Sequence, residues 1–225
     1  MPIELLLTAG PTREPIDHVR FLSNRSSGQL GLAVASEAVS RHWNTTLLLG
    51  TGGIDPPAAL TRCCHPFDTT DDLQSLLGIH APKCDILIMA AAVADFIPRQ
   101  NSGQAKLSRH HGPINLTLDP APDLIAQIAT QSRSNQTIVG FALESSDTME
   151  SAARAKLDRK GLDAIVANPL ETMGAQTISA MFMERGGDAI AADPDLSKTQ
   201  FASWLLDQVA VLHERRVRGV SSAPP

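Results

Sequence analysis

Residues 5–31 read LLLTAGPTREPIDHVRFLSNRSSGQLG. An apolar run passes into a long loop rich in Pro, Arg, Asp and Asn, and Ser27 and Gly28 then open a helix. In an α/β protein, the carboxyl end of a strand facing a helix N-terminus is the usual place for a phosphate-bearing ligand. The loop has about 17 residues, roughly three times the usual length of such a connection. We interpret it as a ligand site, and the alternative is an irregular cap on the sheet edge.

The composition indicates a single domain that acts on small molecules. A chain of 225 residues with 43% hydrophobic content builds one sizeable α/β core. We predict one domain over residues 1–215, followed by a disordered tail at 216–225. The formal net charge of −5 argues against a general nucleic-acid surface. An anionic ligand must therefore meet a local cluster of basic side chains.

The cysteines and the N-terminal residues indicate in which cellular compartment we expect the protein. Cys63, Cys64 and Cys84 are odd in number, lack metal-ligand spacing, and include an adjacent pair that makes a poor disulfide. We expect reduced thiols. The chain begins without the features of a signal peptide, and no stretch has eighteen uninterrupted apolar residues. We expect a cytoplasmic protein that contacts neither membrane nor nucleic acid.

The spacing of apolar residues predicts a three-layer, Rossmann-like α/β fold, with a mostly parallel sheet and helices on both faces. Alternation predicts an exposed strand at 114–118, and turn residues predict a β-hairpin over 178–191. Thr70 and Ser197 are predicted helix caps, and Pro122 lies near the predicted start of another helix. Residues 99–118 form a candidate flap. Other strands are expected at 3–8, 45–49, 62–65, 84–90, 137–142 and 164–167, and helices at 27–41, 70–77, 147–160 and after 122 and 197.

Two runs in the opening segment, TAGPTREPID (8–17) and VRFLSNRSSGQLG (19–31), closely resemble the signature of phosphopantothenoylcysteine synthetase. The resemblance is strongest to the synthetase half of the bacterial bifunctional coenzyme A biosynthesis flavoprotein, here standing alone. It extends over nearly the whole chain. Further matching segments are AAAVADF (90–96), KL (106–107), PDLI (122–125), GFALE (140–144), Lys156 with Lys160, and AN (167–168).

The resemblance implies a ligase that joins 4'-phosphopantothenate and L-cysteine through an acyl-cytidylate, with release of CMP and pyrophosphate. CTP is then a co-substrate and Mg²⁺ (or Mn²⁺) the cofactor, with the metal ligands unknown. It also implies a homodimer that meets its partner near 99–118 or 178–191. The bifunctional relatives carry a flavin-dependent decarboxylase ahead of the synthetase. This sequence has no room for it before Ile3, so we expect the decarboxylase on a separate chain.

The nucleotide follows from the same resemblance. Bacterial members of the family use CTP and eukaryotic members use ATP. The matches at Ala91-Ala92, Lys106 and Phe141 follow the bacterial pattern. We therefore expect CTP, with the base read by backbone and small residues, because lysines that hold a triphosphate do not distinguish bases.

The resemblance also implies residue roles. Asn24 and Lys106 are predicted as catalytic: Asn24 steadies the intermediate's carbonyl while cysteine attacks, and Lys106 serves the triphosphate. Substrate binding is assigned to Arg20, Asn24 and Ala94. Where the family motif continues Lys-Lys after Lys106, this chain has Ser108-Arg109. Nucleotide binding is assigned to Gly10, Ser27, Gly28, Ala91, Ala92, Asp95, Lys106, Pro122, Asp123, Leu124, Ile125, Phe141, Lys156 and Lys160.

Taken alone, these residues leave alternatives open. Lys156 and Lys160 lie four apart on one predicted helix, where like charges repel unless an anion lies between them. A solvated charged helix face is the alternative. Lys106 also fits a solvated loop, Asn24 a turn, and Phe141 the core. Asp95 fits either a loop cap or a contact to ribose hydroxyls or metal.

Two other functions are weighed. A nicotinamide-dependent reductase needs G-x-G-x-x-G directly after the first strand, whereas this chain has Ala9-Gly10-Pro11-Thr12. The chain also lacks tyrosine, which removes the Tyr-x-x-x-Lys chemistry of short-chain dehydrogenases. A non-catalytic nucleotide sensor on the same fold stays open, and Asn24, Asp95 and Lys106 argue against it.

Overall fold

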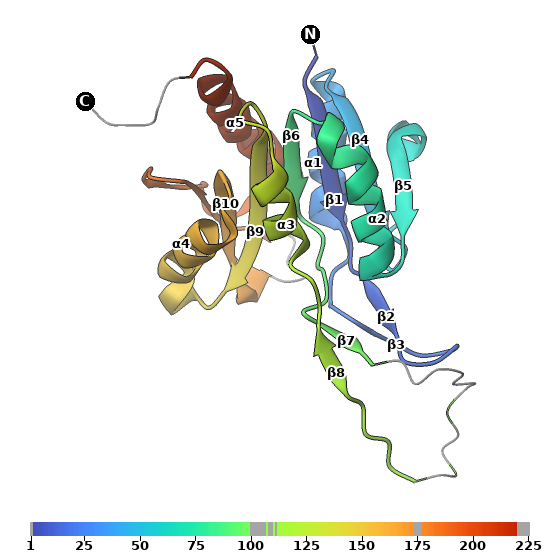
Figure 1. The fold of residues 1–225 in the computed structure, drawn as a ribbon. Coiled ribbons are helices and arrows are strands. Elements are labelled where there is room, and N and C mark those ends of the chain that lie inside the picture. The colour runs from blue at the N-terminus through green and yellow to red at the C-terminus, as the bar shows by residue number, and fades with distance from the viewer. Residues whose placement is uncertain (1, 100–106, 108–109, 111, 173–176, 220–225) are drawn as a thin grey trace.

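The computed structural model describes residues 2–99, 107, 110, 112–172 and 177–219. An eight-stranded sheet runs through it in the order β13-β12-β10-β9-β6-β1-β4-β5 (Figure 1). The six strands from β10 to β5 are parallel, and β12 and β13 join antiparallel at one edge. The bounds are β1 Glu4–Ala9, β4 Asn44–Gly50, β5 Cys64–Phe67, β6 Ile86–Met89, β9 Thr137–Glu144, β10 Ala164–Pro169, β12 Met181–Glu184 and β13 Ala189–Ala191.

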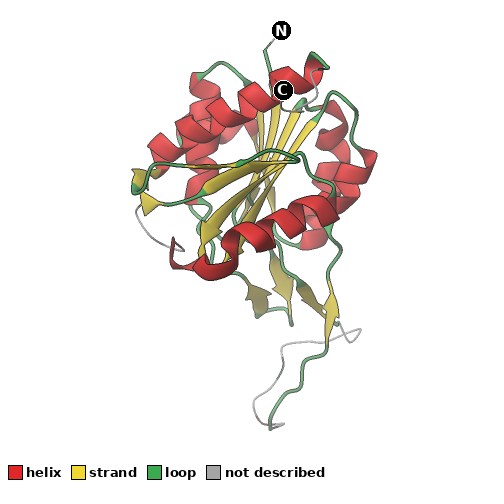
Figure 2. Cartoon of the chain, turned by 90° about the vertical axis from the view of Figure 1, so that its left-hand side faces the viewer, coloured by secondary structure: helices red, strands yellow, loops and turns green. Residues whose placement is uncertain are grey.

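Helices cover both faces of the sheet, which confirms the predicted three layers (Figure 2). Side chains alternate between the two faces along a strand. In β1, Leu5 and Leu7 join the core under one helical layer, and Leu6 joins the core under the other. The first layer holds α1 (Gln29–Ser40) and α5 (Lys198–Val217), and the second holds α2 (Thr70–His80), α3 (Leu124–Gln131) and α4 (Met149–Lys160).

The strand order has a direct consequence for ligand binding. Taken in chain order, the six parallel strands stand 3-2-1-4-5-6, the order of doubly wound dinucleotide-binding folds. The chain leaves β1 toward one edge of the sheet and later continues from the adjacent β6 toward the other edge. A crevice therefore opens at the carboxyl ends of β1 and β6, which is where such folds bind ligands.

Several predicted boundaries need correction. Residues 58–63 form a 3₁₀ helix, so the strand predicted at 62–65 is β5, two residues later. Thr69, not Thr70, caps α2, because its side chain accepts the Asp72 N–H while the Asp72 carboxylate accepts the Thr69 N–H. Pro122 precedes α3 rather than opening it, and Asp123 is the cap. Ser197 caps α5 as predicted, with Gln200 completing a capping box.

The largest error concerns the predicted exposed strand at 114–118. Residues 112–117 have no regular structure, and only Leu118 lies in a strand, β8 (Leu118–Pro120). That strand pairs with β7 (Phe96–Pro98), beyond the carboxyl edge of the main sheet. A strand needs a partner, and the ladder with β7 begins only at Leu118. Half of the candidate flap, including Lys106, lies outside the described residues.

Two small pairings were not predicted. β2 (Arg13–Pro15) and β3 (Phe21–Ser23) form a hairpin within the long loop that follows β1. β11 (Thr177–Ile178) pairs with β14 (Leu196–Ser197). The predicted hairpin near the chain end is confirmed as β12 and β13, at one edge of the sheet. No helix among the described residues has the length and apolar character needed to span a membrane.

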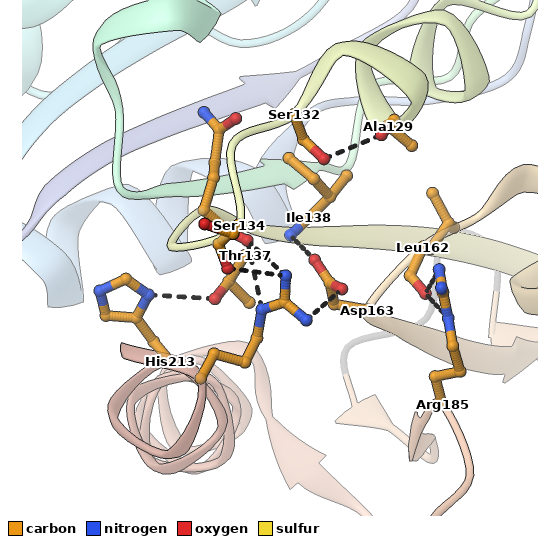
Figure 3. A network of polar contacts seen from close by, with 11 residues as sticks. Ala129, Ser132, Ser134, Thr137, Ile138, Leu162, Asp163, Arg185 and His213 are labelled. Carbon is orange, nitrogen blue, oxygen red and sulfur yellow. Dashed lines mark hydrogen bonds and ion pairs between the residues drawn. The ribbon is translucent and has the colours of Figure 1, made fainter. Parts of the chain in front are cut away.

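The last helix extends beyond the predicted domain end and is anchored by buried polar contacts. Arg216 and Val217, predicted in the tail, belong to α5. Arg216 Nη1 lies 2.7 Å from Oδ1 of Asp163, whose Oδ2 accepts the Ile138 N–H (Figure 3). Burial raises the pKa of Asp163, although Arg216 and the Ile138 N–H oppose the rise. These contacts join α5 to the amino ends of β9 and β10, opposite the crevice; residues 220–225 lie outside the described part.

Candidate functional site

The strands β6, β9 and β10 border a cleft of about 650 Å³ at the carboxyl edge of the sheet. This is within the usual range for small-molecule sites. The segment before and into α1 forms one wall, and the segment after β6 forms another. The N-terminus of α3, the end of β9 and the inner side of α4 complete it. Five segments of the chain thus meet at the switch point of the sheet.

Most predicted site residues line this cleft. Arg20 and Gly10 do not line it, and Lys106 lies outside the described residues. The predicted residues that line it are Asn24, Ser27, Gly28, Ala91, Ala92, Ala94, Asp95, Pro122, Asp123, Leu124, Ile125, Phe141, Lys156 and Lys160.

Close packing of glycines sets the shape of the wall at α1. Gly28 caps the helix with φ +76°, a conformation that favours glycine. A Cβ there would meet the backbone of Gly10 at 3.2 Å, and a Cβ on Gly31 would lie 2.3 Å from that of Ala9. Gly10 therefore supports the wall from below instead of lining it. The close approach brings the first N–H groups of α1 to the cleft, where Ser27 Oγ makes only a long 3.4 Å contact to one of them. Such N–H groups favour anions.

The opposite wall, residues 90–94, is fixed by the first strand and its loop. The Ala91 N–H donates to Thr8 Oγ1, and the Ala94 N–H donates to Thr12 Oγ1. The Ala92 N–H donates to the Gly10 carbonyl. Both threonines are buried, so these bonds are shielded from water. The backbone that we predicted to read a nucleotide is therefore held in one conformation.

Asn24 joins the two walls. Its Nδ2 donates to the carbonyls of Ala92 and Val93, at 3.2 and 3.1 Å. Both amide hydrogens are thus used, and Oδ1 has no hydrogen bond among the described residues. Its backbone carbonyl accepts the Ser26 N–H in a local turn, as the turn alternative predicts, but its side chain makes no local hydrogen bond among the described residues. Its amide spans 68 residues of sequence to connect the loop after β1 with the loop after β6.

Arg20 lies at the base of the candidate flap instead of in the cleft. Asp17 accepts hydrogen bonds from Arg20 and from the Leu107 N–H, and Arg20 donates to the Leu107 carbonyl. The Arg20 guanidinium and the Leu107 N–H hold the pKa of the Asp17 carboxyl far below its usual value. Asp17 and Arg20 thus bind both backbone groups of Leu107, the residue that follows Lys106.

The two lysines of α4 both face carboxylates. Lys156 Nζ lies 2.6 Å from Oε1 of Glu144, and Lys160 Nζ lies 3.1 Å from Oδ2 of Asp123. Each pair joins α4 to another wall element, β9 in one case and the cap of α3 in the other. The lysines are therefore not a solvated helix face, since each is paired across the cleft wall, and their mutual repulsion is offset by two negative charges.

Phe141 fits both alternatives drawn from the sequence. It is half-buried in β9, lines the cleft and packs against the core beneath α1 and α5. The cleft is basic, although the chain is acidic overall. Its charged lining side chains are the basic Arg25, Lys156, Lys160 and Lys198 and the acidic Asp95 and Asp123. The expected local cluster of bases is confirmed.

Among the lining residues that sequence reasoning did not assign to the site are three long polar side chains. Arg25 and Gln29 lie within the recognised signature, and their position beside Asn24 and Gly28 was an available signal. For Lys198, the first residue of α5, the sequence offered no signal. Its ammonium group donates a hydrogen bond to Gln29 Oε1, which lies 169 residues earlier in the chain. Among described residues, no group of three or more His, Cys, Asp or Glu side chains could hold a metal ion.

Comparisons with known proteins agree with this architecture. Residues 2–212 match the family DFP, the DNA/pantothenate metabolism flavoprotein C-terminal domain. A cysteine/cysteine sulfinic acid decarboxylase of an unknown prokaryotic organism is 39% identical over 171 residues, covering 76% of this chain and 47% of that protein. The coenzyme A biosynthesis bifunctional protein CoaBC of Mycobacterium tuberculosis (strain ATCC 25618 / H37Rv) is 43% identical over 175 residues, covering 73% of this chain and 41% of that protein.

This chain therefore spans less than half the length of these two relatives. A solved structure matches almost end to end. The crystal structure of the C-terminal domain of a CoaBC protein superposes with a TM-score of 0.77 at 30% identity, covering 93% of this chain and 95% of that one.

Proposed function

The chain belongs to the DNA/pantothenate metabolism flavoprotein C-terminal domain family, and from this membership we propose that it is a phosphopantothenate–cysteine ligase of coenzyme A biosynthesis. One observation carries the proposal: fourteen predicted site residues, from segments far apart in the sequence, line one basic cleft at the switch point of the sheet. The related CoaBC proteins are named for coenzyme A biosynthesis. A carboxylic acid, an amine and a nucleoside triphosphate are the three substrates.

In the first step, a carboxylate oxygen of 4'-phosphopantothenate attacks the α-phosphorus of CTP. An O–P bond forms, and the bond to pyrophosphate breaks. Such transfers depend chiefly on alignment and charge stabilisation. Lys156 and Lys160 supply positive charge from α4, and the N-terminus of α1 supplies N–H groups on the opposite wall. Lys106, which lies outside the described residues, is proposed to add a further positive charge.

The cleft residues fit a magnesium ion of the kind that accompanies nucleotides. Mg²⁺ binds through one or two carboxylates together with substrate phosphates, so no larger protein cluster is needed. Asp123 is occupied by Lys160 and by capping α3. The Asp95 carboxylate lines the cleft and has no side-chain hydrogen bond to any described residue, so Asp95 would hold the ion. When bound, Mg²⁺ neutralises triphosphate charge.

In the second step, the cysteine amine attacks the acyl carbonyl. A C–N bond forms, the acyl C–O bond to CMP breaks, and the proton that the nitrogen loses passes to water. We expected Asn24 to donate a hydrogen bond to this carbonyl, but its two N–H groups already point at Ala92 and Val93. We therefore propose that Oδ1 accepts a hydrogen bond from the attacking amine and orients its lone pair.

The nucleotide and the assembly remain proposals. We propose CTP because the family resemblance is to bacterial members. The N–H groups of Ala91 and Ala94 are bonded to Thr8 and Thr12, which fixes the backbone of this segment in position. The backbone groups that stay unbonded there can pair with one base, and a wrong base would leave them unpaired. We also propose a homodimer, since Leu118 at the end of the flap, Phe96 just before it and Phe21 in β3 are large exposed apolar side chains. A monomer in light scattering at micromolar concentration would exclude it. A separate decarboxylase chain and a cytoplasmic location stay predictions.

The decisive experiment measures pyrophosphate release. With phosphopantothenate, CTP and Mg²⁺ but no cysteine, the ligase releases about one pyrophosphate per active site, and adding cysteine starts turnover and amide formation. A nucleotide sensor releases none in either condition. Lys106→Gln should slow the first half-reaction and leave the preference for CTP over ATP unchanged, because a triphosphate contact does not read the base. Equal use of CTP and ATP by the parent enzyme would contradict the CTP assignment.

A further inference from the structure

A second cavity, of about 300 Å³, lies between α2 and α3 on the sheet face that also carries α4. The two helices are neighbours in Figure 1, and a hydrogen bond from Gln74 to Gln127 joins them. Its floor is apolar, and its rim is polar. The side chains around it come from α2 (Gln74, Leu77), the following turn (Ala81, Pro82), α3 (Leu124, Gln127, Ile128, Gln131) and the turn before β9 (Arg133, Gln136).

The charge of the lining restricts what can bind. Among the described residues, Arg133 is the one charged side chain in the lining, and the other polar side chains there are glutamines. The guanidinium uses one nitrogen, Nη2, to donate to the Cys84 carbonyl, so further N–H groups remain available. A cation is disfavoured here, whereas a carboxylate or a similar anion gains a charge-assisted hydrogen bond. The apolar floor favours a ring or a branched aliphatic body.

The cavity shares a wall with the cleft. Leu124, the first residue of α3, lines both spaces, and the adjacent Asp123 and Ile125 line the cleft. The α3 helix has only eight residues and is joined to α4 by the Asp123–Lys160 pair. A ligand that fixes the position of α3 therefore also fixes one wall of the cleft.

We propose that the cavity between α2 and α3 is a regulatory site for a small organic monoanion with an apolar body, whose binding changes nucleotide affinity in the neighbouring cleft. The binding part of the proposal stands independently, and the coupling part rests on the proposed function. By linkage, nucleotide must change the affinity for the anion by the same factor.

The first experiment measures binding without nucleotide, with naphthalene-1-acetate as the probe and isothermal titration as the readout. Gly78 offers a matched pair of variants, because it lies at the cavity and an added Cβ meets nothing within 4 Å. Gly78→Trp should fill the mouth and weaken probe binding by at least about tenfold. Gly78→Ala should bind as the parent does. Equal binding by both variants, or no binding by the parent, overturns the site.

The second experiment tests the charge. Naphthalene-1-acetamide, which has the same shape without the charge, should bind several-fold more weakly to the parent. Arg133→Gln should remove that difference, while Arg62→Gln, an exposed arginine elsewhere on the chain, should keep it. Thermal unfolding shows whether Arg133→Gln is folded. If the variant is not folded, the ratio of the two probes' dissociation constants for the parent protein decides whether the site prefers an anion. A ratio of one overturns the anion assignment.

The third experiment tests coupling on the parent and on Gly78→Trp. Saturating probe should shift the dissociation constant of CTP by about fivefold or more in the parent, and by less in the variant. An unchanged CTP affinity with bound probe overturns the coupling alone. Failure of CTP to bind in any condition, with the probe still bound, contradicts the proposed function and leaves the anion site intact.

Discussion

The ammonium nitrogen of Lys156 lies 2.6 Å from Oε1 of Glu144, and that oxygen is buried and makes no hydrogen bond to the described part of the chain besides this ion contact. Lys156→Met should leave a buried carboxylate without its counter-charge and reduce the free energy of unfolding by about 1–2 kcal/mol. Adding Glu144→Gln should restore most of that stability. Urea unfolding of the two single variants and the double variant measures the coupling.

The same variants separate stability from binding. If Lys156 contacts the triphosphate, CTP affinity stays low in the stabilised double variant. Recovery of affinity together with stability would mean that the lysine has only a structural role.

Asn24→Ala should leave binding of CTP and phosphopantothenate near the parental level and reduce amide formation by roughly 10²-fold, because the amine loses its orienting acceptor. Quench experiments should then show an accumulated acyl-nucleotide and a single burst of pyrophosphate. Product formation at the parental rate would show that Asn24 only joins the two loops.

Gly31→Ala and Gly78→Ala place the same methyl group into two helices with opposite expected results. The new Cβ of the first lies 2.3 Å from that of Ala9, and the second meets open space. We expect a loss of about 1–3 kcal/mol of stability for Gly31→Ala and a gain of about 0.5–1 kcal/mol for Gly78→Ala. Chemical denaturation of both variants tests this. A stable Gly31→Ala protein would mean that α1 is free to move off the sheet, with loss of the cleft shape.

His213 should make stability depend on pH. It is buried, and its Nδ1 lies 3.0 Å from Thr137 Oγ1 (Figure 3). Burial lowers the pKa of His213, with Arg216 acting in the same direction and Asp85 and Glu214 opposing. The unfolded chain, titrating near 6.5, then binds the proton more tightly than the folded protein. The contribution of neutral His213 to the free energy of unfolding is therefore fully present above about pH 6.5, and it is lost as the pH falls from there through the lower pKa of the folded protein.

His213→Gln keeps a hydrogen-bonding side chain that does not titrate. Urea midpoints measured at about pH 7.5 and pH 5.5 should fall more steeply in the parent than in this variant. His80, whose pKa burial also lowers, contributes equally to both proteins. Parallel slopes would contradict the assignment to His213.

The three cysteines should differ in reactivity. Burial raises the pKa of Cys84 to about 11, and the thiol lies among buried side chains. Burial also raises the pKa values of Cys63 and Cys64, but these two are only partly buried. Because the thiolate is the reactive form, iodoacetamide should modify Cys84 more than about tenfold more slowly near neutral pH. Peptide mass spectrometry gives the rates, and unfolding in urea should equalise them.

Local signals predicted most of the fold. Apolar runs such as Ile86–Met89 identify buried strands without reference to the rest of the chain, and a cap with its partner three residues later, Ser197 with Gln200, identifies a helix start. The errors arose where a partner decides the outcome. Residues 114–118 alternate like a strand, but β7 pairs only from Leu118.

The site shows the same division. Most of the lining residues lie within the recognised motifs, and each motif can be identified from a short stretch of sequence alone. Other contacts of the site join segments that are 12 to 68 residues apart, and they form only when β1, β6 and β9 lie side by side in the folded sheet. They are the ion pairs Lys156–Glu144 and Lys160–Asp123 and the hydrogen bond from Asn24 to Ala92. Gly10 was predicted to bind the ligand because it belongs to the opening motif. In the structure it packs beneath Gly28, and only the folded arrangement shows this supporting role.

The two described ends of the chain lie on the side of the sheet away from the cleft. The Glu4 N–H at the start of β1 donates to Asp85, which precedes β6, and Arg216 near the end of α5 binds Asp163 ahead of β10. A reporter domain or a surface tether attached at either end should therefore leave the cleft mouth open. The protein is therefore suited to immobilisation for nucleotide-binding sensors. A domain fused to the N-terminus should lie on the side of the sheet opposite the cleft.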